Sequence, residues 1–200
     1  MLFVPAIASA LLGAACNQTG LTKPPRSAIE QLLISSAADR ALAQAHWSFV
    51  HGKKIFVDRS VYESTDKDYV IGSIRDYVSI NGGMLVQKLE DADYILEPRS
   101  GALSIDASSS VIGVPASSAP IPFAGAISLP EIALFKSEKQ YSTAKLAILV
   151  YERDSRQHVA STGPLIGRAN IKYYKILGYI GYTKTTIPEK QRPKKQENNK

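Results

Sequence analysis

The chain has 200 residues, of which 44% are hydrophobic and 21% are charged. This composition excludes a fibrous or largely disordered protein and fits one globular domain with flanking segments. The formal net charge is +6, but residues 184–200 hold six basic and two acidic side chains and so supply +4 of it. Because the rest of the chain is nearly neutral, we predict no nucleic-acid partner. A single cysteine excludes an internal disulfide and a cysteine-based zinc site.

Residues 1–15 have the character of a signal peptide. They carry no charged side chain, and the run is too short to span a bilayer permanently. Small residues precede Cys16, and this ending resembles the lipobox of bacterial lipoproteins. The resemblance implies that Cys16 is acylated, with palmitate among its lipids, and that Asn17 directs the protein to the outer membrane, facing the periplasm. The alternative is an ordinary secretory signal with a coincidental cysteine.

A polar tether over residues 16–26, with two adjacent prolines, leads to the first predicted helix. Ser27 and Glu30 have the spacing of a capping box, which predicts a helix start. Apolar residues then recur every four positions, as expected for one buried stripe of a helix over residues 28–44.

A strand, a helix and a second strand are expected next. Residues 53–58 have a continuous apolar centre, which predicts a central strand. Thr65 and Asp68 predict a second helix start, and residues 81–83 (NGG) predict its end. A strand over residues 84–87 completes a βαβ unit. Because the two glycines lack the spacing of a phosphate-binding loop, no cofactor is predicted.

Residues 83–106 join an acidic corner to a strand. We interpret the carboxylates of residues 89–93 as a solvated turn rather than a metal site. The strand changes phase, since its apolar residues switch parity between residues 96 and 103, which predicts a bulge or bend at residues 98–101. Ser100, Asp106 and His158 could be drawn as a catalytic triad, but no nucleophile elbow surrounds the serine, so we do not predict one.

Three segments carry a resemblance to a known group of proteins. The segment ADYILE at residues 92–97 is similar to the strand opening of bacterial envelope lipoproteins such as the curli-secretion channel. In this order, VIGSIRDYV, ADYILEPRSGAL and LPEIALFK resemble a family of bacterial lipoproteins without an assigned activity. The resemblance covers most of residues 27–163 and implies a compartment and a domain type, but no catalytic residue.

Residues 107–130 contain no charged side chain and four prolines. We predict a loop lying against the protein, because each proline would interrupt a strand ladder. Two alternatives stay open. The segment could be a partner-contact loop or, by analogy with the curli channel, a membrane-inserting or oligomer-forming hairpin.

The remaining chain predicts mainly strands. We expect strands at residues 132–135 and 143–151, and a hairpin that turns at residues 154–156 into a strand over residues 157–161. The three histidines lack the spacing of metal ligands, so no metal site is predicted. Residues 170–186 hold four tyrosines, and we expect a final segment packed across the sheet edge, with nucleic-acid stacking or a membrane interface as alternatives. The basic tail, residues 184–200, is expected to be disordered.

These expectations define a single domain over residues 27–183. Its predicted class is α/β with α+β character: a mixed sheet of five or six strands, two helices largely on one face and an antiparallel C-terminal hairpin. We expect a non-enzymatic lipoprotein of the bacterial cell envelope, which acts by contact with other envelope proteins or with copies of itself. The alternative is a periplasmic hydrolase or small-ligand-binding domain with a site near Arg99. The candidate contact residues are Arg99, Ser100, Val111, Ile112, Phe123, Tyr173 and Tyr174.

Overall fold

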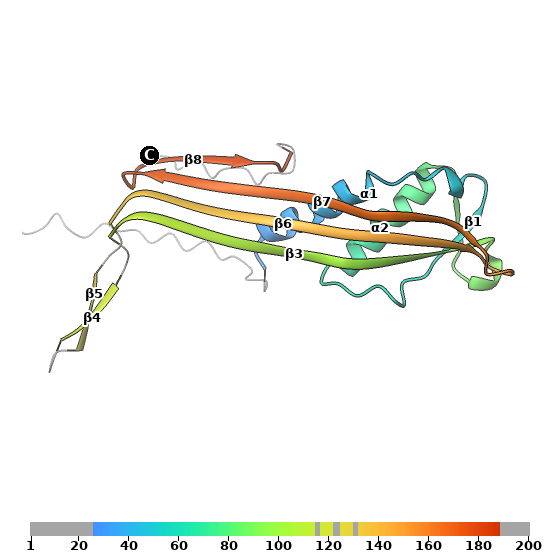
Figure 1. The fold of residues 1–200 in the computed structure, drawn as a ribbon, viewed down its shortest axis with the longest axis horizontal. Helices are drawn as coiled ribbons and strands as arrows, with labels where there is room; N and C mark the ends of the chain where they lie inside the picture. The colour runs from blue at the N-terminus through green and yellow to red at the C-terminus, as the bar shows by residue number, and fades with distance from the viewer. Residues whose placement is uncertain (1–25, 115–116, 122–124, 130–131, 189–200) are drawn as a thin grey trace, which may run out of the picture.

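A computed structural model describes residues 26–114, 117–121, 125–129 and 132–188. It contains a mixed six-stranded sheet in the order β2-β1-β3-β6-β7-β8 and two main helices, which confirms the predicted fold class (Figure 1). The helices are α1 (Ala28–Leu42) and α2 (Lys67–Ile80). The strands of this sheet are β1 (Lys54–Val57), β2 (Met84–Leu85), β3 (Tyr94–Val114), β6 (Ile132–Glu152), β7 (His158–Ile176) and β8 (Ile180–Thr185). A separate antiparallel pair consists of β4 (Ser117–Ile121) and β5 (Gly125–Leu129).

The predicted capping box starts α1. The Glu30 amide donates to the Ser27 hydroxyl at 3.2 Å, and the Ser27 amide donates to the Glu30 carboxylate at 2.8 Å. Two donors that the first turn would otherwise leave unpaired are thereby satisfied. Leu33, Ala37 and Ala41, on the predicted apolar stripe, are fully buried.

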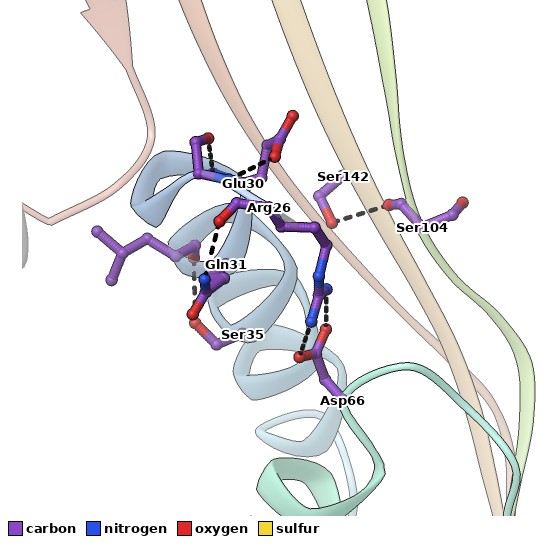
Figure 2. Close-up of polar contacts among 9 residues, drawn as sticks. Arg26, Glu30, Gln31, Ser35, Asp66, Ser104 and Ser142 are labelled. Atoms are coloured by element: carbon purple, nitrogen blue, oxygen red, sulfur yellow. Dashed lines mark hydrogen bonds and ion pairs between the residues drawn. The ribbon is translucent and has the colours of Figure 1, made fainter. Parts of the chain in front are cut away.

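The βαβ unit is present, with β1 parallel to both β2 and β3. The helix predicted after residue 65 is present as α2, but the predicted capping is wrong, because neither Thr65 nor Asp68 caps it. Asp66 precedes the helix without a side-chain cap, and its carboxylate instead accepts two hydrogen bonds from the Arg26 guanidinium, both at 2.7 Å (Figure 2). This bidentate pair ties Arg26, which precedes the N-cap of the first helix, to the start of the second helix.

The helices and one face of the sheet enclose the core. Leu96 of β3, Ile148 of β6 and Ile171 of β7 belong to it, together with Leu33 and Val70 of the helices. At Gly167 of β7 an added Cβ would lie 1.9 Å from the carbonyl oxygen of Ala37, so the backbone of α1 lies directly on the strand. Only glycine permits so close an approach.

The predicted bulge is confirmed. The pairing of β3 with β6 shifts between Ser100 and Ala102. Because one residue is inserted there, Leu96 before the bulge and Leu103 after it both pack on the helix side of the sheet. The chain thus restores its apolar face after the change of parity.

Three parts of the fold differ from expectation. Residues 107–114 continue β3 rather than forming a loop, and β6 is one strand over 132–152 rather than two. The domain also continues past residue 183, because β8 runs to Thr185 and Ile187 is 1% exposed in the core. Arg40 of α1 holds this end by donating to the carbonyl oxygens of Arg168 and Thr186.

The sheet extends far beyond the helices. The strands β3 and β6 have 21 residues each and β7 has 19, and they project as a ribbon past the helical layer, with β8 along its outer part (Figure 1). We call this part the distal sheet: residues 106–114, 132–141, 170–176 and 180–185. Its helix-side face continues the face that carries the core, and its other face is the open face. Among the described residues, no helix is long and apolar enough to cross a membrane.

Candidate functional site

The structure separates the residues of the imagined triad. Ser100, Asp106 and His158 lie opposite Leu146, Tyr141 and Tyr151 of β6, respectively. These positions on one strand are five residues apart, which corresponds to about 17 Å per step. The three side chains therefore cannot act on one substrate atom.

The acidic corner is a turn, as predicted. Residues 89–91 form a short 3₁₀ helix, and the Asp93 carboxylate accepts a hydrogen bond from the Lys54 amide at 2.8 Å. This carboxylate serves the backbone at the start of β1. Across the ranges that the structure describes, no three His, Cys, Asp or Glu side chains group closely enough to hold a metal ion.

The predicted contact residues do not form one site. Arg99 lies opposite Ala147 and Ile112 opposite Phe135, twelve positions along β6, which is about 40 Å. Arg99 and Ser100 therefore lie under the helical part of the molecule, away from the distal sheet. Cys16 and Phe123 lie outside the described residues.

Four of the predicted residues lie in the distal sheet, on opposite faces. Tyr173 packs against the core and so belongs to the helix-side face, where burial raises the pKa of its hydroxyl. Val111 shares that face by strand alternation. Ile112 and Tyr174 point to the open face, where Tyr174 contacts two further aromatic rings.

Two hollows of the described structure lie away from Arg99. One lies along β3 and β6 of the distal sheet, and the other lies between residues 44–49 and residues 159–165 of β7. Neither is lined by Arg99 or Ser100. The second includes His46 and Ser161, but no carboxylate lines it.

The open face of the distal sheet is arranged in rows that cross four strands. The register places Ile112, Phe135, Ile176 and Ile180 in the outermost row. The next row inward consists of Ser110, Ser137, Tyr174 and Tyr182. In it the rings of Tyr174 and Tyr182 stack with centroids 4.6 Å apart, and Phe135 lies 6.2 Å from Tyr174. Aromatic contacts therefore join three strands.

A basic row follows the aromatic rows. It consists of Ser108, Lys139, Lys172 and Lys184, so that three lysines lie side by side on β6, β7 and β8. Lys172 also lies over the ring of Tyr141, 5.5 Å from its centroid. The open face thus changes from basic to aromatic to aliphatic toward its end.

Exposed hydrophobic side chains gather at that end. We call this set the apolar tip: Ile112, Val114, Ile132, Leu134, Ile176, Leu177, Tyr179, Ile180 and Tyr182. Their exposed fractions range from 38% for Ile176 to 96% for Tyr179. Monomeric soluble proteins rarely expose so many large apolar side chains at one end, so the apolar tip is a candidate interaction surface.

Both edges of the distal sheet lack a neighbouring strand among the described residues. Pairing of β1 with β3 ends at Leu96, and no described strand continues it along the rest of β3. At the other edge, β8 pairs only with β7. From residue 107 to the end of β3 no charged side chain protects the edge.

Sequence reasoning missed the basic row and most of the apolar tip. A signal was present, because Lys172, Tyr174 and Ile176 are mirrored by Ile180, Tyr182 and Lys184 around Gly178. This mirror order is what two paired strands of a hairpin require when equal residues face each other. In the turn at residues 177–179, Leu177 and Gly178 have positive φ, 51° and 71°.

A comparison with protein-family models places the chain. Residues 9–190 match a family of unknown function, DUF6655, and the chain belongs to this family. No curated protein matches the chain. Family membership therefore supplies no activity, and function must be argued from the geometry above.

Proposed function

We propose that this member of a family of unknown function is a non-enzymatic component of a bacterial envelope assembly, held at the outer membrane by a lipid on Cys16. It acts by protein contact through the distal sheet. The observation that carries the proposal is the long sheet extension, whose two outer strands have open edges in the described structure. The lipobox resemblance at Cys16 supports the compartment.

An open strand edge is a site for strand addition. It presents unpaired N–H and C=O groups that a further strand can satisfy. Monomeric proteins usually protect such strand edges with charged side chains, prolines or short strands. The inner part of the β3 edge has Pro98, the bulge beside Gly101 and Asp106, whereas residues 107–112 have no proline, no charged side chain and no register shift. The unprotected part lies in the distal sheet.

The two edges are complementary in direction. Successive strands from β3 through β6 and β7 to β8 are antiparallel, so β3 runs toward the tip and β8 runs away from it. The β8 of one copy can therefore pair antiparallel with the β3 of a second copy that points the same way. Such a contact is heterologous and repeats from copy to copy. A different envelope protein could use the same edges by the same pairing.

Site-specific photocrosslinking in the native envelope tests this proposal. A photoreactive phenylalanine analogue is placed at Ser108 on the β3 edge or at Thr183 on the β8 edge, and the matched control is Ser79, which is also exposed but lies on α2. We expect crosslinked products from both edges and not from Ser79. If the products are dimers and higher multimers of this chain, the partner is a second copy. Absence of any product from both edges would contradict the proposal.

The alternative of a hydrolase or ligand-binding domain near Arg99 gains no support from the geometry. Arg99 is exposed, lines neither hollow and has no catalytic partner beside it. We therefore do not propose it.

A further inference from the structure

We propose that the apolar tip enters the headgroup region of an anionic lipid bilayer, with Lys139, Lys172 and Lys184 contacting lipid phosphates. The ligand is a lipid surface carrying negative charge. This inference goes beyond the assembly role proposed above, because it concerns the end of the distal sheet and not its edges.

The order of the rows on the open face matches the order of layers at a bilayer surface. Four residues separate the basic row from the outermost row along each strand, which is roughly 14 Å. Amphipathic surfaces bury their apolar side chains about 5–10 Å deep at the boundary of headgroups and acyl chains. The aliphatic row would then lie among the acyl chains, with the tyrosines at the interface that such rings prefer. Lysine side chains are long enough to reach the phosphates behind them.

The basic row is explained by an anionic partner. Like charges directly opposite each other on neighbouring strands repel and weaken the sheet. Among the described residues, no carboxylate forms an ion pair with any of the three lysines. The nearest acid on this face by register is Asp106, one row further inward and opposite Tyr141. Lipid phosphates would supply the missing negative charge.

The turn at the apolar tip carries an unusual residue. Leu177 has a φ of 51°, a backbone region that favours glycine or asparagine, and its side chain is 60% exposed. A leucine there is strained and gains nothing by burial within the described chain. Burial in lipid would offset both effects.

The direction of α1 agrees with this orientation. The Gln44 side chain donates to the carbonyl oxygen of Ile166, and the Arg40 side chain donates to that of Arg168. The helix α1 therefore runs antiparallel to β7, which runs toward the tip. The first residue of the helix therefore lies at the end nearer the distal sheet (Figure 1). Arg26, the first described residue, therefore lies at the end of α1 nearer the apolar tip.

A local fluorescent reporter tests the inference without the lipid anchor. In the full chain carrying Cys16→Ser, a polarity-sensitive dye is attached to Ile180→Cys in the apolar tip. The matched control is Ile166→Cys, which lies on the same face and is also exposed. Ile180 pairs with Ile176 of β7, and Ile166 lies ten residues further inward on that strand. With phosphatidylcholine vesicles containing roughly one-third phosphatidylglycerol, we expect a blue shift and quenching by headgroup spin labels at residue 180 alone.

Lysine variants test the basic row in the same assay, with a dye at residue 180. Replacing Lys139, Lys172 and Lys184 by Gln should weaken binding to the anionic vesicles about fivefold per lysine, and leave binding to pure phosphatidylcholine unchanged. Lys145→Gln, an exposed lysine further inward on the same face, is the control and should bind as the parent does.

Three results would overturn the inference. They are an equal response at residues 166 and 180, vesicle binding that does not depend on the three lysines, and a response at residue 180 that needs no vesicles and rises with protein concentration. The last result would assign the apolar tip to a second copy of the chain. Edge crosslinking can succeed or fail independently of these results, so the two proposals are tested separately.

Discussion

Tyr69 and Asp39 show how a single side-chain contact joins the two helices. The Tyr69 hydroxyl of α2 donates to both carboxylate oxygens of Asp39 on α1, at 2.9 and 3.0 Å. Burial, followed by the hydrogen bond to the neighbouring carboxylate, raises the pKa of Tyr69 to about 12. Burial also raises the pKa of Asp39, while the bond from Tyr69 lowers it. The neutral phenol is thus the form that the folded state favours.

The pH dependence of this contact follows from the raised pKa. Its stabilisation is fully present below pH 10, where Tyr69 is neutral in both states, and is lost as pH rises from 10 to about 12. Because Tyr69 is 46% exposed, solvent screening reduces the effect, and we expect Tyr69→Phe to cost about 1 kcal/mol of unfolding free energy at pH 8. Urea unfolding measures the difference, which should shrink above pH 10. Tyr179→Phe at a fully open position should change nothing, and a difference for Tyr69→Phe that is constant with pH would contradict the assignment.

At the scale of elements, the close contact of α1 with β7 depends on one glycine. An added Cβ at Gly167 would clash with the backbone of Ala37 and Ala41, whereas one at Gly163 of the same strand would meet nothing within 4 Å. We expect Gly167→Ala to lower the free energy of unfolding by about 1–3 kcal/mol through overpacking. Gly163→Ala should change it by less than about 0.5 kcal/mol. Chemical denaturation compares the two, and equal effects would show that α1 does not lie on β7 as described.

Elements set by neighbouring residues could be predicted from the sequence. The capping box at Ser27, the central strand β1, the turn at Asp93 and the bulge beside Gly101 all follow from local spacing or parity. The start of α2 could not be predicted in the same way. The carboxylate of Asp66 is held by Arg26, forty residues earlier, and no local rule contains that pairing.

The distal sheet could not be predicted from the sequence for a related reason. Residues 107–114 consist of serine, alanine, glycine and a few aliphatic residues, without the apolar alternation that indicates a half-buried strand. They form a strand because β6 pairs with them along its whole outer part. The candidate surface arises from four strands in register, so only the pair Ile112 and Tyr174 was anticipated on its open face. The β7–β8 hairpin pairs Lys172 with Lys184 locally, whereas Lys139 joins them only through the long-range register of β6 with β7.

At the scale of the whole molecule, the chain has two regions, the helix-covered inner sheet and the distal sheet. The helices cover the inner part of the sheet and form the core, and the ribbon carries the exposed surfaces outward (Figure 1). From Ile105, the last residue of β3 that packs on the core, to Val114 the strand covers roughly 30 Å. A projection of this length contributes little to the core, which favours a role in contact with partners.

The mass of the extracted protein tests the assembly role most directly. Edge charges oppose strand addition, so the decisive variant is Ala107→Lys with Ser109→Lys on β3, and the control is Ser79→Lys with Ile80→Lys at the end of α2, where both residues are exposed. After extraction in mild detergent, sedimentation should give a multimer or a complex with an envelope protein for the parent and the control, and a single copy for the β3 variant. Recovery of the parent chain as a single copy, or a β3 variant that assembles like the parent, would contradict the account.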